Sequence, residues 1–368
     1  MKRRDFLKAS LAAAGLASLP SGLLAAGSAQ RPEAVEPPVF SGHSYVDCHL
    51  HYLDFLQVTD GLERLVEAMN AANVERAVLF GMPMIKQWDP SAPKKPKYYL
   101  SNDSRCYYYS GTDFLLLKHL AHAPPRIRSR FIPFICGINA NDMNAADLLR
   151  RLMAEYPGLI AGIGEIMCRH DDLTAQTYGE PPRPDHPALL PVYDLAAEMR
   201  MPVIIHHNIS GAQMDEPLYL AEMENALRHN RETNIVWAHV GVSRRVELSN
   251  LPEVAEGALQ RHSNLYFDLS WLVFENYIAK DEASFAAWAD LIARRPGRFM
   301  VGTDVVGHWD KYAANVLKYN ALLDRLPSKT ARMVARDNIL GLIGPRAAAR
   351  LPRPAGGTAR GTARALAV

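Results

Sequence analysis

Residues 44–51 read Ser-Tyr-Val-Asp-Cys-His-Leu-His, and this stretch decides the fold. It begins as a short strand-like run and ends in a His-x-His motif formed by His49 and His51. Side chains two residues apart on a strand point to the same side. Two imidazoles on one side can bind one cation of the zinc type. A lone His-x-His motif often occurs by chance, so its meaning depends on the rest of the chain.

Seven more runs of this kind follow the first one along the chain. Each has the length and the β-branched or aromatic content of a strand that is buried on both faces. Amphipathic stretches separate the runs, and the clearest helical period covers residues 145–155. Strands are predicted at residues 44–49, 76–81, 131–138, 160–166, 202–206, 235–239, 265–269 and 299–304, and helices at 61–72, 114–121, 145–155, 190–200, 218–230, 254–261, 285–294 and 312–323.

Eight strands, each followed by a helix, predict an α/β fold of the parallel (β/α)8 type, a TIM barrel. The alternative is an open doubly wound sheet, but no glycine-rich phosphate turn follows the first strand. Long loops are expected after strand two, at residues 82–113, and after strand four, at residues 168–188. The first loop is rich in aromatic residues, which favours an ordered lid over disorder. Its aromatic residues are Trp88, Tyr98, Tyr99, Tyr107, Tyr108 and Tyr109.

Three later strands also end in residues that bind metals. His206 ends strand five, His239 ends strand six, and Asp304 ends strand eight. Taken singly, each histidine is more often a hydrogen-bonded core side chain than a ligand. In a barrel, however, the carboxyl ends of all strands meet at one rim. Four imidazoles and a carboxylate at that rim predict a metal centre.

With these residues the chain resembles the amidohydrolase superfamily, and in particular its amidohydrolase-related (amidohydrolase 2) family. The resemblance covers about residues 44–344. It implies that His49, His51 and Asp304 bind the more buried metal and that His206 belongs to the same shell. It further implies that His239 is either a ligand of a second metal or a catalytic imidazole. In such enzymes the residue at Asp304 also accepts the proton of the attacking water.

Strand four carries Glu165 in the sequence Gly-Ile-Gly-Glu-Ile. Many relatives have a carboxylated lysine at this place, and others have no ligand there. The strand end is similar to that of the TatD-type hydrolases, in which an acid bridges two metals. The alternative is that Glu165 caps a loop or pairs with Arg169. The expected cofactor is therefore a divalent metal, zinc with manganese left open, as one or two ions.

Several neighbours of these residues are candidates for lesser roles. Asp47 is expected on the inward side, where it could orient an imidazole. Cys48 is expected on the opposite side, facing the helices. The candidate substrate contacts are Arg169, His207, Arg244 and Trp309. For the arginines the alternative is a solvated surface position, for His207 a side chain that points away from its neighbour, and for Trp309 simple loop packing.

The residues predict a hydrolase that activates a water to cleave a small carbonyl substrate, a lactone, ester or amide. Asp304 is the expected proton acceptor. One alternative is a decarboxylase of aromatic or unsaturated acids with a single metal, which the resemblance also includes. Glu165 speaks against it, since such enzymes have no ligand on strand four. A second alternative is a metal-binding barrel without activity.

The N-terminus is expected to be an export signal. Arg3-Arg4 resembles the twin-arginine motif, and the apolar run at residues 11–24 is too short and broken to span a bilayer stably. The predicted organisation is a signal peptide at 1–29, a linker at 30–43, the barrel at 44–346 and a disordered tail at 347–368. The mature protein would be periplasmic or secreted.

Composition limits the partners of the 368-residue chain, which is 48% hydrophobic and 22% charged. The net charge is +2, but the leader contributes +3, so the remainder carries about −1. Such a neutral protein has no broad basic surface for a nucleic acid. We expect a small-molecule substrate and no stable membrane anchor, with a homo-oligomer left open. Free buried thiols are favoured over disulfides for Cys48, Cys106, Cys136 and Cys168.

Overall fold

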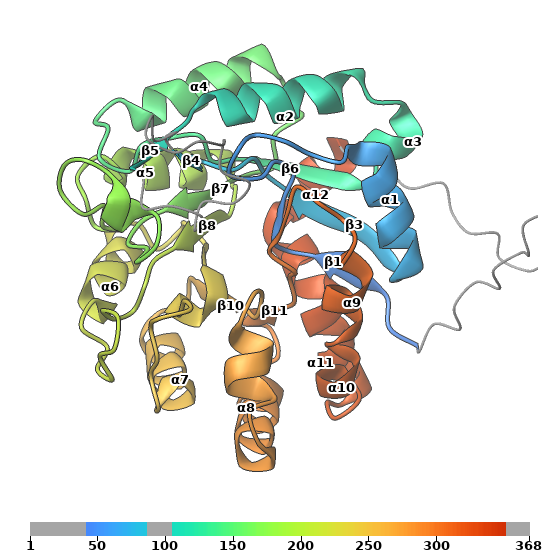
Figure 1. Ribbon diagram of the computed structural model, residues 1–368, viewed down its shortest axis with the longest axis vertical. Helices are drawn as coiled ribbons and strands as arrows, with labels where there is room; N and C mark the ends of the chain where they lie inside the picture. The colour runs from blue at the N-terminus through green and yellow to red at the C-terminus, as the bar shows by residue number, and fades with distance from the viewer. Residues whose placement is uncertain (1–41, 87–104, 351–368) are drawn as a thin grey trace, which may run out of the picture. The chain divides into compact units, whose positions relative to one another are not determined.

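The computed structural model describes residues 42–86 and 105–350. The predicted signal peptide, most of the predicted linker, Trp88, Tyr98, Tyr99 and the last 18 residues lie outside this part of the chain. An eight-stranded parallel sheet forms the centre, in the order β1-β3-β6-β7-β8-β9-β10-β11 (Figure 1). Its strands are β1 (Tyr45–Asp47), β3 (Val74–Leu79), β6 (Phe131–Ile135), β7 (Gly162–Met167), β8 (Val203–His206), β9 (Ile235–Trp237), β10 (Leu265–Asp268) and β11 (Phe299–Met300).

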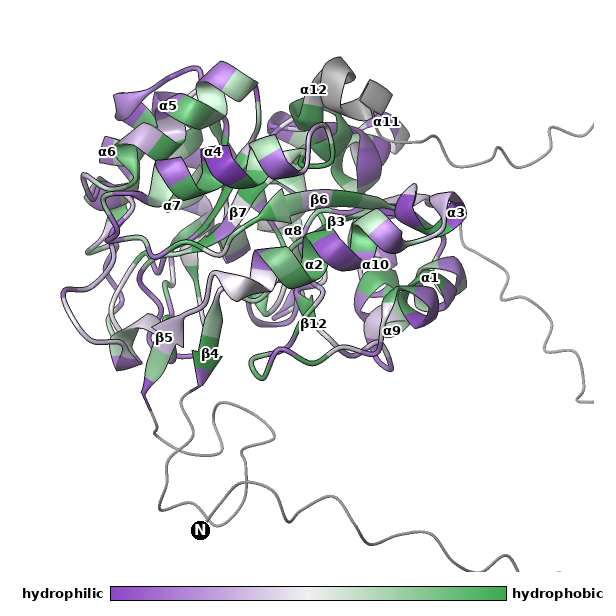
Figure 2. Ribbon diagram, turned by 90° about the horizontal axis from the view of Figure 1, so that it is seen from above, coloured by the Kyte–Doolittle hydropathy of each residue, from purple (hydrophilic) through white to green (hydrophobic). Residues whose placement is uncertain are grey.

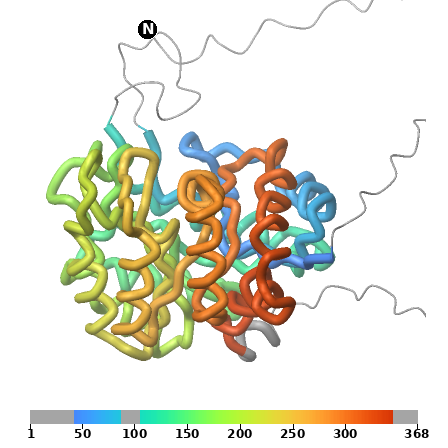
Figure 3. The backbone as a smooth tube through the Cα atoms, turned by 90° about the horizontal axis from the view of Figure 1, so that it is seen from below, coloured from blue at the N-terminus to red at the C-terminus, as the bar shows by residue number. Residues whose placement is uncertain are grey.

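The first and last strands of this sheet lie side by side. The backbone N–H of Cys48 donates to the carbonyl of Val301 at 3.1 Å. Beyond this point β2 (Leu50–His51) pairs in parallel with β12 (Val305–Val306). Figure 3 shows the N-terminal segment, in blue, beside the C-terminal elements, in red. The sheet therefore curls until its edges meet, which confirms the predicted (β/α)8 barrel.

Helices surround the strands, and their polar faces look outward (Figure 2). The eight predicted helices are all present, although the last one is divided into α9 and α10. They are α1 (Leu62–Ala71), α2 (Gly111–His122), α4 (Ala145–Glu155), α5 (Leu190–Met199), α6 (Leu220–His229), α7 (Leu251–Arg261), α8 (Glu282–Arg294), α9 (Tyr312–Leu317) and α10 (Asn320–Leu323). The short α3 (Pro125–Arg128) and α11 (Ser328–Arg332), the terminal α12 (Asn338–Arg350) and two π-helical turns, η4 (Phe274–Ile278) and η5 (Met333–Asp337), were not predicted.

The two long loops contain structure of their own. In the loop after β3, β4 (Met84–Lys86) and β5 (Cys106–Tyr108) form an antiparallel hairpin. The hydroxyl of Tyr108 donates to the carbonyl of Met167 at 2.6 Å, which ties this hairpin to the end of β7. The loop after β7 includes a short 3-10 helix, η2 (Thr174–Gln176). Whether either loop acts as a lid stays a prediction.

The first strand is interrupted between β1 and β2, and this corrects two predictions. Asp47 does not contact an imidazole. Its carboxylate accepts hydrogen bonds from the hydroxyl of Thr303 at 2.7 Å and from the backbone N–H groups of Thr303 and His49, both at 3.0 Å. Cys48 packs with Val46 in the apolar interior cluster instead of facing the outer helices. Side chains alternate regularly only within a strand. The rule that residues two apart point to the same side therefore fails after Asp47.

The four cysteines are buried and free, as expected. Among the described residues, no helix has the length and apolar character needed to cross a membrane.

Candidate metal centre

The predicted ligands meet at the carboxyl ends of the strands. His49 and His51 come from the segment that ends in β2, Glu165 from β7, and His206 from β8. His239 and Asp304 follow β9 and β11, each with a backbone φ of 53°. This left-handed conformation is strained for a residue with a side chain, and such strain tends to occur at functional sites.

Glu165 lies at the centre of the four imidazoles. One of its carboxylate oxygens lies 3.7 Å from Nε2 of His49, and the other lies 3.3 Å from Nε2 of His51. Nδ1 of His206 is 3.2 Å away and Nε2 of His239 is 3.4 Å away. The carboxylate is 1% exposed. Glu165 therefore neither caps a loop nor pairs with an arginine, the two alternatives left open by its sequence position.

Asp304 approaches three of the same imidazoles from the side of the cavity. Its carboxylate lies 3.4 Å from Nε2 of His49, 3.2 Å from Nε2 of His51 and 3.7 Å from Nε2 of His239. Its side chain is 13% exposed, whereas Glu165 is almost completely covered. Of the two central carboxylates, Asp304 is therefore the one that a substrate or water can reach more readily.

All four imidazoles are held by a partner on the ring edge away from Glu165, and for His206 this partner is the side-chain oxygen of Asn208, 3.1 Å from Nε2. Nδ1–H of His49 donates to Asp268 at 2.9 Å, and Nδ1–H of His51 donates to the carbonyl of Gly81 at 2.7 Å. Nδ1 of His239 lies 2.8 Å from the hydroxyl of Ser270. Such outer hydrogen bonds fix the tautomer and the orientation of a metal-binding histidine. In His49, His51 and His239 Nε2 is thereby left as the atom for the centre, and in His206 it is Nδ1.

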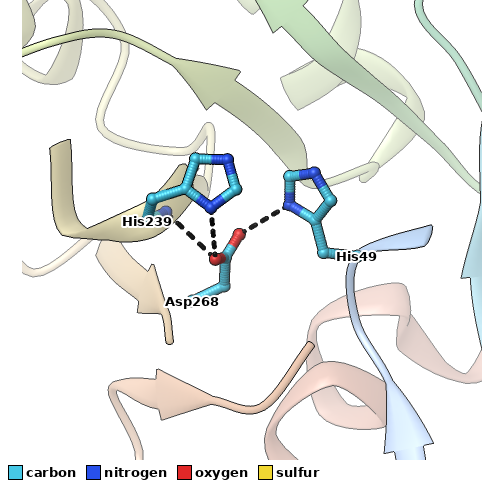
Figure 4. Close-up of side chains that lie close together, drawn as sticks. All are labelled: His49, His239 and Asp268. Atoms are coloured by element: carbon cyan, nitrogen blue, oxygen red, sulfur yellow. Dashed lines mark hydrogen bonds and ion pairs between the residues drawn. The ribbon is translucent and has the colours of Figure 1, made fainter. Parts of the chain in front are cut away.

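Asp268 was missed in the sequence, and it links two of these rings (Figure 4). One of its carboxylate oxygens accepts the hydrogen bond from His49, and the other accepts the backbone N–H of His239 at 3.0 Å. The same oxygen accepts the hydroxyl of Ser270 at 2.5 Å. The signal was present, because an acid in the apolar strand Leu-Tyr-Phe-Asp-Leu needs a polar partner.

The residues fit a metal. Nε2 of His49 is buried and has no hydrogen-bond partner in the described part of the chain, although carboxylates lie on two sides of it. Metal bonds of about 2.0–2.1 Å at tetrahedral angles place neighbouring ligand atoms roughly 3.3 Å apart. The nitrogen-to-oxygen distances around Glu165 and Asp304, 3.2–3.7 Å, lie close to this spacing. Three groups of possible ligands result, His49-His239-Asp268, His49-His51-Asp304 and Glu165-His206-His239, and the last two together contain all six predicted ligands.

The charges in this centre are strongly coupled. Burial alone would raise the pKa of Glu165, but the charge of His49 and the hydrogen bonds of the other imidazoles bring it well below its ordinary value. The pKa of Asp304 is lowered in the same way. Burial would lower the pKa of His51, yet hydrogen bonds to Asp304 and Glu165 raise it to about 9. Protons on the imidazoles thus balance the buried carboxylates in the metal-free protein.

A cavity of about 240 Å³ opens onto the centre. One part of its wall is apolar and consists of Phe55, Met82, Met167, Leu173 and Val306. Besides the predicted ligands, two further residues with polar groups line it, His170 and Trp271. Neither was among the predicted site residues. His170 belongs to the loop after β7, and its ring stacks on His206 with centroids 4.5 Å apart.

The predicted substrate contacts lie elsewhere. His207 is 1% exposed, and its ring donates to the carbonyl of Tyr219 at 3.1 Å. The indole N–H of Trp309 donates to the carbonyl of Gly61 at 2.9 Å. Neither residue lines the cavity at the centre. Strand alternation turns His207 away from His206, and Trp309 packs on the start of α1.

The two arginines are paired with acids. Arg169 forms a two-pronged pair with Glu222, with distances of 2.8 and 2.7 Å, and lines a neighbouring cavity of about 250 Å³. Arg244 pairs with Asp172 at 2.5 Å. Neither guanidinium lines the cavity at the metal centre. The ion pair between Arg244 and Asp172 thus joins the loops after β7 and β9.

Comparison with known families shows to which family this barrel belongs. The amidohydrolase family model matches residues 46–342. The chain belongs to the amidohydrolase family. A model of the twin-arginine translocation signal sequence matches residues 1–20, in agreement with the expected export signal. No curated protein matches the chain.

Solved structures with the same fold differ widely in sequence. An uncharacterized TIM-barrel protein from Bordetella bronchiseptica is 14% identical with a TM-score of 0.53, and the match covers 83% of this chain and 100% of that one. An amidohydrolase from Burkholderia multivorans with bound zinc has the same identity and TM-score, over 82% and 99%. A 2,6-dihydroxybenzoate decarboxylase from Rhizobium, also 14% identical, has a TM-score of 0.47 over 82% and 98%. At this identity the similarity shows the fold alone.

Proposed function

We propose that this amidohydrolase-family protein is a metal-dependent hydrolase of a small carbonyl substrate, a lactone, ester or amide. The observation that supports it best is the position of Glu165. It touches all four imidazoles and joins the two groups that together contain the predicted ligands, as a bridge between two cations would. Zinc suits this set of imidazoles and carboxylates, and manganese remains a second option. The zinc in the Burkholderia relative agrees with the first choice.

A bound divalent ion would lower the pKa of a water to near 7 and polarise the scissile carbonyl. The protein supplies the proton acceptor. Asp304 is ionised at neutral pH, because its pKa is lowered by the imidazoles, and it is the partly exposed acid of the centre. Asp304 would accept the proton of the attacking water and pass it to the leaving group. His239, fixed by Ser270, lies beside it as a ligand or a second proton carrier.

Metal content and a substrate panel test this proposal. We expect about two equivalents of metal in the purified protein, and hydrolysis of at least one compound from a panel of lactones, esters and N-acyl compounds with zinc or manganese. One equivalent, with no hydrolysis but release of carbon dioxide from an aromatic or unsaturated acid, would establish the decarboxylase instead. A protein that holds metal but acts on none of these compounds would be a metal-binding barrel without activity.

We also propose that the protein works outside the cytoplasm, in the periplasm or secreted, as one barrel domain on a small-molecule substrate. The twin-arginine signal supports this. Changing Arg3 and Arg4 together to lysine should keep the chain in the cytoplasm, unprocessed. Normal appearance of the mature form outside the cytoplasm would contradict the export route.

A further inference from the structure

The cavity at the metal centre has two polar groups that the proposed reaction does not use. They belong to the side chains of His170 and Trp271, which both line the cavity and have ring centroids 6.0 Å apart. Both rings lie against the ligand histidines, since His170 stacks on His206 and Trp271 meets His239 edge to face at 5.1 Å. A substrate at the centre would therefore lie beside them.

His170 is fixed in one tautomer by its own loop. Its Nδ1 accepts the backbone N–H of Asp172 at 3.0 Å, so in the neutral ring the hydrogen resides on Nε2. The backbone N–H of His170 donates to the hydroxyl of Thr174 at 2.7 Å, and its carbonyl accepts the N–H of Ala175 at 3.0 Å. The residue is 5% exposed. The loop thus holds a rigid ring with a defined N–H donor.

Trp271 is held in a position that its backbone does not favour. Its φ is 58°, a left-handed conformation that is strained for an aromatic residue. Its carbonyl accepts a hydrogen bond from the ammonium group of Lys318 at 3.2 Å. Neither its indole N–H nor Nε2 of His170 has a hydrogen-bond partner among the residues that the structure describes. Two residues that line the cavity thus each carry an N–H donor without an acceptor in the described part of the chain.

We propose that His170 and Trp271 form a donor pair that binds an acceptor oxygen of the substrate, a carboxylate or carbonyl oxygen outside the scissile bond. The neighbouring wall of Phe55, Met82, Met167, Leu173 and Val306 receives the apolar frame that carries this oxygen. The substrate class is thus a small ring-bearing or otherwise apolar compound with a second oxygen. The inference rests on the proposed function only for the reaction that the bound compound undergoes. The binding of the compound to His170 and Trp271 does not depend on it.

Two substitutions remove one donor each and keep the surrounding structure. In His170→Asn the side-chain oxygen can still accept the N–H of Asp172, as in an Asx turn, but no group reaches the cavity. Trp271→Phe keeps an aromatic ring against His239 but loses the indole N–H together with some ring volume, a loss of volume that the control at Trp309 shares. His186→Asn and Trp309→Phe are matched controls away from the cavity. His186 accepts the N–H of Ala188 through the same atom, and the indole of Trp309 is already bonded to Gly61.

The test uses benzoate as the carboxylate probe and benzamide as the carbonyl probe, titrated calorimetrically into the metal-loaded protein. We expect both donor variants to bind the matching probe more weakly, by about 2- to 12-fold for a neutral acceptor and 10- to 150-fold for a charged one. Both controls should bind like the original protein. In ¹⁵N spectra the indole N–H signal of Trp271 should shift on addition of probe, and that of Trp309 should not.

Three results would overturn the inference. The original protein binds neither probe, the donor variants bind both with unchanged affinity, or His170→Asn loses metal, which would make His170 a support of His206. None of these touches the hydrolase proposal, which depends on metal content and turnover. Conversely, a protein that holds metal and hydrolyses nothing in the panel would end the hydrolase proposal and leave the probe titrations readable.

Discussion

The barrel has two buried layers with opposite chemistry. The interior of the barrel contains an apolar layer, to which Ile339 and Ile343 of α12 also belong. Its strand residues are Val46, Val78, Ile132, Phe134, Ile204, Val236 and Met300. At the carboxyl ends lies a layer of imidazoles and carboxylates that is buried almost as deeply. Four of these strands therefore carry an apolar side chain first and a predicted ligand two to four residues later.

The two layers contribute to the protein in different ways. Burying an aliphatic side chain stabilises the fold by about 1.5–3 kcal/mol. Burying a carboxylate is unfavourable unless it is paired, and here the imidazoles supply the pairing. We infer that the apolar layer stabilises the barrel and the charged layer is kept for its ligands. Changes in the charged layer should then alter metal and activity, and changes in the apolar layer should alter stability alone.

The largest effect is expected from Glu165→Gln. The substitution removes the negative charge that would allow two cations to lie about 3.5–4 Å apart. We expect the variant to lose one metal, to keep the other at His49, His51 and Asp304, and to lose activity by more than about 100-fold, since even outer partners are worth 10–100-fold. Elemental analysis and rates measure both. If the original protein and the variant hold one equivalent each and react equally fast, the single-metal decarboxylase becomes the better reading.

Asp268→Asn tests the outer support of the centre. The variant keeps the shape of the side chain but weakens its hold on His49, so metal affinity should fall by about 10–100-fold. Asp47→Asn is the matched control, because Asp47 is a similarly buried acid at the end of β1 that holds Thr303 and the backbone N–H of His49 but no imidazole. Competition with a chelator measures the affinity. Equal losses in the two variants would show a general effect of buried acids.

The sequence predicted the frame of this centre better than its surroundings. Strand ends placed His49, Glu165, His206 and Asp304 at one rim because barrel strands are parallel and the rim is shared. Asp268 was overlooked because its role is to hold other ligands, and no spacing marks such a residue. Trp271 could not be found in the same way, since its position depends on an unusual backbone angle.

The sequence pattern also did not predict the orientation of the side chains next to the ligands. Alternation assigned Asp47 inward and Cys48 outward, but the break between β1 and β2 reverses both. The arginines were expected at the substrate because they follow strand ends, yet an acid in the loop after β7 pairs with Arg244 and a helix acid pairs with Arg169. Pairing between loops is a tertiary property, which single-sequence spacing does not contain.

Metal binding to this layer should depend on pH. In the metal-free protein the pKa of His51 is raised to about 9, so its proton pairs with the carboxylates and stabilises the fold fully below about pH 6.5. This stabilisation is lost as the pH rises through 9. A metal must displace the proton, so zinc affinity should rise about tenfold per pH unit between pH 7 and 9 for each proton released. Chelator-buffered titrations at pH 7, 8 and 9 measure this, and a flat affinity would mean that the imidazoles are already neutral.

The smallest effect is expected in the apolar layer, from Ile132→Val on β6, a strand that carries no predicted ligand. Ile132 is fully buried in the interior cluster, and the substitution removes one carbon from it. Stability should fall by about 0.5–1.5 kcal/mol, since the cavity that is left cannot fill completely. Thermal unfolding of the metal-free protein should show a decrease of about 2–4 °C per kcal/mol. Metal content and rates should not change.

Leu218→Ala, at a side chain that is 46% exposed, is the control and should leave the unfolding temperature nearly as it was. If Ile132→Val instead lowers metal affinity, the two layers are coupled through the strands, and the separation between a stabilising layer and a ligand layer does not hold.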